Sequence, residues 1–242
     1  MEALDPKYHD PLLGVVFDLD GTLVLSHHAF DRMRREIVRL AEHYGVTPGH
    51  LSVTMTIPAL MGLSLKELEH SGAPETTRMR FEAEAGHRID EIEMEALPTT
   101  VIRDGAEKLL RGLTGRGYRI GILTRSSGAF ARAALEKTGL TSYIRVLRSR
   151  SDTGPAKPDP EALLLVLRQL EVPPDRALFV GDHLMDAECA TRARVRFHAV
   201  LPPTPGSLGT DVDRFKAAGA IAIAPDLEEL SRQLGVAQPP SA

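Results

Sequence analysis

The chain has 242 residues, of which 43% are hydrophobic and 26% charged, so it can form one sizeable core or a core with a small companion domain. Its 29 basic and 33 acidic side chains give a net charge of −4. Non-specific binding to nucleic acid or to an anionic membrane needs clustered Lys and Arg in excess, so we expect neither partner. The single cysteine, Cys189, excludes an intramolecular disulfide and a multi-cysteine metal site.

The sequence also argues against export or membrane insertion. Residues 1–10 contain no basic region followed by an apolar run. The longest apolar stretches, such as 162–167, are far shorter than the roughly 20 residues that span a bilayer. We therefore expect a cytoplasmic protein.

The first predicted element is a strand at 12–17, an apolar run of the kind that is buried on both faces of a parallel sheet. The segment 26–95 that follows contains no convincing strand. Helical spacing recurs in it at 30–44, 57–69 and 78–94. We predict a small all-helical domain at 26–95, inserted between 1–25 and 96–242 of the main domain.

The rest of the chain alternates strands and helices. Apolar runs predict strands at 118–123, 177–180 and 220–224, with a weaker one at 198–201. Asp104 is the expected N-cap of one helix, and Asp159 with Pro160 begins another. This alternation implies right-handed crossovers, so we predict an α/β fold with a doubly wound, Rossmann-like parallel sheet.

Polar motifs lie where the predicted strands end, which is where open α/β sheets place ligands. They are DLDGTL at 18–23, Thr124, KPDP at 157–160 and GDHLMD at 181–186. Ionised carboxylates about 4 Å apart repel by roughly 4 kcal/mol at an effective dielectric of about 20. A cluster of Asp18, Asp20, Asp182 and Asp186 would therefore need a cation, and an all-oxygen site suits Mg²⁺ better than Zn²⁺.

Together the four motifs resemble, in order and spacing, those of the haloacid dehalogenase-like hydrolase superfamily, abbreviated HAD. The resemblance covers nearly the whole chain. The helical insertion after the first motif is similar to the cap domain of the phosphoglycolate-phosphatase-like branch. The family implies a Mg²⁺-dependent phosphomonoester hydrolase that acts on a small phosphorylated metabolite, with phosphoglycolate as one candidate.

The same resemblance implies roles for individual residues. Asp18 would be the nucleophile that forms an aspartyl-phosphate, and Asp20 the general acid and base. Thr124 and Lys157 would hold the phosphate oxygens.

Further residues complete the predicted site. The resemblance implies Mg²⁺ ligands from the carboxylates of Asp18 and Asp182, from the backbone carbonyl of Asp20 and, through water, from Asp186. Arg125 and Ser126 are predicted substrate-binding residues beside Thr124, although a solvated role explains Arg125 equally well. His183 stands where relatives often carry serine.

Three other functions remain open. A phosphomutase resembling β-phosphoglucomutase would use the same core as an isomerase, but relatives of that type have a histidine twelve residues after the nucleophile, where this chain has Phe30. A haloacid dehalogenase would need neither Asp20 nor a metal. A non-catalytic binding or regulatory protein is disfavoured because no motif residue is missing.

Substrate specificity and assembly are less readable. Arg32, Arg34, Arg35 and Lys66 are candidates for recognising an acidic substrate, and a solvated helix face explains them equally well. Both a monomer and a homodimer are compatible with the sequence.

Overall fold

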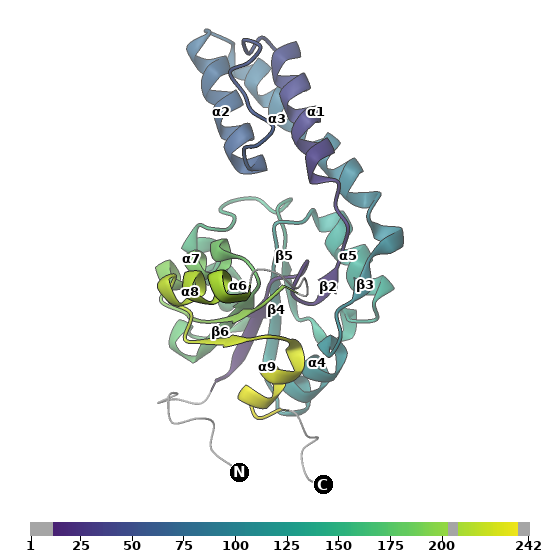
Figure 1. Cartoon of the computed structure of the whole chain (residues 1–242), viewed down its shortest axis with the longest axis vertical. Coiled ribbons are helices and arrows are strands. Elements are labelled where there is room, and N and C mark those ends of the chain that lie inside the picture. The colour runs from purple at the N-terminus through teal and green to yellow at the C-terminus, as the bar shows by residue number, and fades with distance from the viewer. Residues whose placement is uncertain (1–11, 203–207, 237–242) are drawn as a thin grey trace. The chain divides into compact units, whose positions relative to one another are not determined.

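The computed structural model describes residues 12–202 and 208–236. Contacts divide the chain into two compact units, shown in Figure 1. Unit 1 comprises Met1–Ser26 and Thr100–Ala242 where these are described, and unit 2 is His27–Thr99.

Unit 1 is built on a six-stranded sheet in which every pair of neighbouring strands is parallel. In spatial order its strands are β5 (Val146–Arg148), β4 (Arg119–Leu123), β1 (Gly14–Phe17), β6 (Ala177–Gly181), β7 (Arg196–Val200) and β8 (Ala222–Ala224). The chain starts in the centre of the sheet and winds outward in both directions. The predicted doubly wound α/β fold is therefore confirmed.

Helices cover both faces of this sheet. They are α4 (Ala106–Gly115), α5 (Gly128–Lys137), α6 (Pro160–Leu170), α7 (Leu184–Ala193), α8 (Leu208–Ala217) and α9 (Leu227–Gln233), with short 3-10 turns at Thr141–Tyr143 and Pro174–Arg176. Side chains alternate along β1, so Val15 and Phe17 pack with α4, α5 and α9, whereas Val16 packs with α6, α7 and α8. Because β1 is buried on both faces, its sequence is apolar throughout.

One strand, one strand boundary and one helix cap differ from the sequence-based predictions. Strand β5 was not predicted, because its three half-buried residues at the sheet edge form no apolar run. Strand β7 begins at Arg196, two residues before the predicted start. The Asp159 side chain accepts a hydrogen bond from Glu161 N and caps α6 as predicted. The prediction for Asp104 is wrong, since Gly105, with φ of 84°, directly precedes α4.

A short antiparallel ribbon lies where the chain leaves and re-enters unit 1. It pairs β2 (Val24–Leu25) with β3 (Val101–Ile102). At its end the Thr100 hydroxyl donates to Ser26 Oγ over 3.1 Å. The ribbon was not predicted, because two-residue strands have no periodicity to read.

Unit 2 is helical, with α1 (Phe30–His43), α2 (Ile57–His70), α3 (Glu75–Met94) and a 3-10 turn at Leu97–Thr99. Its own core contains Met33 and Ile37 from α1, Leu60 from α2, and Phe81 and Ile89 from α3. The helices agree with the predicted ones, except that α3 begins three residues earlier. Within the described residues, no helix is long and apolar enough to cross a membrane.

Candidate active site

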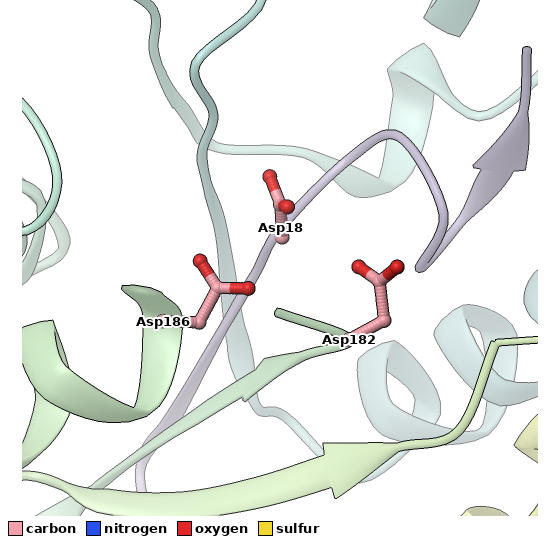
Figure 2. A group of neighbouring side chains, drawn as sticks. All are labelled: Asp18, Asp182 and Asp186. Atoms are coloured by element: carbon pink, nitrogen blue, oxygen red, sulfur yellow. The ribbon is translucent and has the colours of Figure 1, made fainter. Parts of the chain in front are cut away.

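Three carboxylates meet at the carboxyl ends of the two central strands, as Figure 2 shows. Asp18 directly follows β1, Asp182 follows β6, and Asp186 lies in the first turn of α7. One oxygen from each lies within 4.8 Å of the others. Strands β1 and β6 are parallel neighbours, with Phe17 opposite Val180, so the pairing itself brings the first and fourth motifs together.

Lys157 provides a positive charge inside this cluster. Its Nζ lies 2.8 Å from Asp18 Oδ1 and 2.7 Å from Asp186 Oδ1, and its side chain is 2% exposed. Burial by itself would lower the pKa of Lys157, but Asp18 and Asp186 outweigh burial and raise that pKa above its usual value. The lysine is therefore protonated at neutral pH, and three carboxylates face one ammonium group.

The remaining negative charge makes the site suitable for a divalent cation. Burial and the neighbouring carboxylates raise the pKa of Asp182 and that of Asp186 to about 7. A cation among these oxygens would favour the ionised forms. The donors are all carboxylate oxygens, which suit Mg²⁺.

Two glycines leave room for the carboxylates. A Cβ atom on Gly21 would lie 2.2 Å from Asp182 Oδ2, and one on Gly181 would lie 2.3 Å from Asp186 Oδ2. Gly21 also has a φ of 83°, which side chains rarely adopt. The backbone of both motifs therefore approaches the carboxylates as closely as glycine permits.

The turn after β1 carries Asp20 and is held by several hydrogen bonds. Gly21 N donates to Val24 O over 2.8 Å, and the Thr22 hydroxyl donates to Asp182 Oδ1 over 2.9 Å. Asp20 is half-buried in this turn. Its carboxylate is not a member of the three-carboxylate cluster found among the described residues.

Three predicted substrate-binding residues, Thr124, Arg125 and Ser126, directly follow β4. Thr124 is buried, and its backbone N donates to Arg148 O at the end of β5. Ser126, also buried, donates its backbone N–H to Thr124 Oγ1 over 3.1 Å. Arg125 Nη1 donates to the Lys157 carbonyl over 2.7 Å, so this guanidinium links the second motif to the third.

His183 has a structural role that its position did not reveal. Its Nδ1 accepts a hydrogen bond from Met185 N over 3.1 Å, and its backbone N donates to Asp186 Oδ2 over 3.2 Å. These bonds form a capping box at the start of α7. The histidine therefore caps the helix, as a serine can.

The sequence reasoning assigned no role to Thr22 or Arg103. Thr22 lies inside the DLDGTL motif, so its position in the sequence could have predicted that it contacts the site. Arg103 belongs to no motif, yet its side chain donates to the Gly21 carbonyl. No local pattern pointed to it, because it lies 82 residues from Gly21 in sequence.

Comparison with known proteins identifies the class. The family model of haloacid dehalogenase-like hydrolases matches residues 12–194. An N-acetylmuramic acid 6-phosphate phosphatase from Pseudomonas aeruginosa is 27% identical over 226 residues, covering 83% of this chain and 89% of the relative. A phosphoglycolate phosphatase from Rhodospirillum rubrum is 29% identical over 241 residues, covering 93% of this chain and 92% of the relative.

Solved structures agree on the fold. A hydrolase from Pseudomonas syringae superposes with a TM-score of 0.61 at 23% identity, covering 92% of this chain and 97% of that one. A HAD family hydrolase from Deinococcus radiodurans, with bound phosphate and sodium, superposes with a TM-score of 0.58 at 20% identity. The match covers 95% of this chain and 99% of that one. The chain belongs to the haloacid dehalogenase-like hydrolase family. Within that family it is a phosphatase.

Proposed function

We propose that this chain is a Mg²⁺-dependent phosphomonoester hydrolase that acts on a small phosphorylated metabolite through an aspartyl-phosphate on Asp18. The observation that carries the proposal is the contact of Lys157 Nζ with both Asp18 and Asp186 inside a three-carboxylate cluster. A buried ammonium beside a candidate nucleophile suits a reaction in which negative charge spreads over phosphoryl oxygens.

Asp18 is held in one orientation for attack. Its Oδ1 accepts from Leu19 N over 2.8 Å and lies 2.8 Å from Lys157 Nζ. Both donors bind the same oxygen, so the carboxylate is fixed at one end and its other end can face the substrate. One carboxylate oxygen then attacks phosphorus in line, and the bond between phosphorus and the ester oxygen breaks.

Asp20 would move the proton in both half-reactions. In its protonated form it gives a proton to the departing alkoxide, and it then takes a proton from the water that attacks the phosphorus of the aspartyl-phosphate. That attack releases inorganic phosphate and restores the Asp18 carboxylate. The hydrogen bond from Gly21 N to Val24 O supports this role because it fixes the backbone directly after Asp20.

The other motif residues would hold the phosphoryl group and the cation. Lys157 and Thr124 offer an ammonium group and a hydroxyl to its oxygens, and the Ser126 backbone N–H orients that hydroxyl by donating to Thr124 Oγ1. Asp18, Asp182 and Asp186 would hold Mg²⁺, together with the backbone carbonyl of Asp20. When bound, Mg²⁺ supplies charge neutralisation for the phosphate.

The substrate would be a small phosphorylated metabolite. Both curated relatives described above are named for phosphatases of such molecules, one a phosphorylated sugar acid and one phosphoglycolate. The Deinococcus radiodurans structure, which shares this fold, was solved with bound phosphate and sodium. We propose that unit 2 is a cap domain that selects among such substrates.

Water, rather than a second sugar phosphate, would accept the phosphoryl group. Phe30 is 49% exposed at the start of α1 and cannot form the hydrogen bond that a histidine would make there. Incubation with β-glucose 1-phosphate, Mg²⁺ and a trace of glucose 1,6-bisphosphate should yield no net glucose 6-phosphate. Glucose 6-phosphate that accumulates faster than free phosphate would contradict hydrolysis.

The central test measures phosphate release from p-nitrophenyl phosphate in the presence of Mg²⁺ by the wild-type protein and by Asp18→Asn. The amide keeps the shape of the side chain and removes the nucleophile, so we expect a loss of about 10³-fold or more with an unchanged circular dichroism spectrum. Wild-type turnover by Asp18→Asn would contradict covalent catalysis at Asp18.

A further inference from the structure

Arg103 is a buried arginine outside the four motifs. It directly follows β3, and its backbone N donates to Leu23 O over 3.0 Å. The residue is 4% exposed. A buried guanidinium is costly unless hydrogen-bond acceptors surround it, so its partners indicate why it is retained.

The guanidinium joins two segments at the active-site end of the sheet. Nη1 donates to the Gly21 carbonyl over 2.6 Å, and Nη2 donates to the Leu201 carbonyl over 2.5 Å. Gly21 belongs to the turn that carries Asp20, and Leu201 directly follows β7. The fork therefore ties the turn after the central strand to the end of a strand two places away in the sheet.

The charge of Arg103 also fits this place. Burial lowers the pKa of Arg103, whereas Asp182 and Asp226 raise it. Arginine stays charged because its ordinary pKa lies far above neutrality. The side chain thus attracts Asp182, which also accepts the hydroxyl hydrogen bond of Thr22 from the same turn.

We propose that Arg103 is a positioning residue that holds the Asp20 turn in the geometry needed for proton transfer to the leaving group. This inference rests on the proposed function, in which Asp20 donates its proton to the ester oxygen as the bond from that oxygen to phosphorus breaks. A planar fork with separate donors can reach both carbonyls, whereas a lysine presents a single charged nitrogen.

The leaving group distinguishes this role from a general contribution to folding. Phenoxide is a stronger base than p-nitrophenoxide, so phenyl phosphate needs the proton from Asp20 more than p-nitrophenyl phosphate does. A misplaced Asp20 should therefore slow phenyl phosphate more. Loss of folded protein would slow both esters equally, and kcat/KM reports the half-reaction that breaks the ester bond.

The experiment compares Arg103→Met with a matched control, Arg119→Met. Arg119 also donates to two backbone carbonyls, Leu170 O and Glu171 O, each over 2.8 Å. It lies at the start of β4, away from the carboxyl ends of the strands. Both variants lose an arginine that bridges carbonyls, but only Arg103 contacts the Asp20 turn.

For Arg103→Met we expect kcat/KM to fall about 10²-fold with phenyl phosphate and about tenfold or less with p-nitrophenyl phosphate. For Arg119→Met the ratio of the two values should equal that of the wild type. Arg103→Lys should fall between wild type and Arg103→Met, and it carries the same comparison if Arg103→Met fails to fold.

Hydrogen exchange gives a second readout that does not depend on activity. Arg103→Met should speed amide exchange in the segment 19–25, and Arg119→Met should not. An unchanged ester ratio together with unchanged exchange would overturn the role of Arg103. A wild-type protein with no Mg²⁺-dependent activity on either ester would instead overturn the proposed function.

Discussion

The two units of this chain differ in how their chemistry relates to their fold. In unit 1 the polar residues that follow β1, β4 and β6 are brought together by parallel pairing, and each is buried or half-buried. In unit 2 the apolar stripe of α1 forms a core, and the charged face forms ion pairs such as Arg32 with Glu95 over 2.5 Å and Arg34 with Asp31. The sheet of unit 1 gathers reactive groups at the carboxyl ends of its strands, whereas the helices of unit 2 distribute charged side chains over their surface.

Removal of Mg²⁺ should produce the largest effect and should act through unit 1. The cluster of Asp18, Asp182 and Asp186 faces one ammonium group, and loss of the cation forfeits several kcal/mol, or about 10³-fold in rate. EDTA should abolish p-nitrophenyl phosphate hydrolysis and Mg²⁺ should restore it. Full activity after exhaustive chelation would contradict the metal assignment.

The need of the carboxylate cluster for Mg²⁺ should also appear in the dependence of Tm on pH. The pKa of Asp182 and that of Asp186 are raised to about 7 in the folded protein. Without metal, the folded state therefore binds more protons than the unfolded state below that value, and its stability falls as pH rises toward about 7. Added Mg²⁺ should raise Tm more at about pH 8 than at about pH 5.5, where protons compete for the carboxylates.

A pair of glycine substitutions tests whether a backbone change lowers kcat only when it lies beside the carboxylates of unit 1. Gly21 and Gly45 both have positive φ, 83° and 111°, so backbone strain alone should cost about 1–2 kcal/mol of stability when either becomes alanine. A Cβ on Gly21 would collide with the Asp182 carboxylate. A Cβ on Gly45, which lies just after α1, would have no atom within 4 Å. Gly21→Ala should lower kcat about 10²-fold, whereas Gly45→Ala should keep wild-type kcat. Equal kinetic effects would contradict the comparison.

Thr22→Val should have a smaller effect on the same carboxylate. Valine keeps the shape of threonine but removes the hydroxyl that donates to Asp182 Oδ1 over 2.9 Å. The Mg²⁺ concentration for half-maximal activity should rise about tenfold. Thr138→Val is the control, because its hydroxyl donates to Ala134 O at the end of α5, and it should leave Mg²⁺ activation unchanged.

Of these changes, deletion of unit 2 should have the smallest effect on the turnover of a small synthetic ester. Ser26 Oγ and Thr100 Oγ1 lie 3.1 Å apart, so a short Gly-Ser linker can replace 27–99. If the truncated protein folds by circular dichroism, it should retain turnover of p-nitrophenyl phosphate and lose its discrimination among phosphorylated metabolites. An unchanged ranking of metabolites would place specificity in unit 1.

The sequence by itself determined most of the architecture of both units. Long apolar runs predicted the strands near β1, β4 and β6, because strands buried on both faces have no polar positions. Helical periodicity predicted α1 and α2 for a different reason: each buries only one face, so apolar residues recur every three or four positions. The four motifs also indicated which strand ends carry reactive groups, since they follow the predicted strands directly.

Only the tertiary structure decided the features that depend on distant neighbours. Strand β5 and the β2–β3 ribbon owe their existence to pairing, not to an apolar run of their own. Lys157 contacts Asp18, which lies 139 positions earlier in the chain, and Asp186, which lies 29 positions later. Arg103 contacts Gly21 across 82 positions. Local patterns cannot encode such contacts, because the fold alone brings these side chains within hydrogen-bond distance.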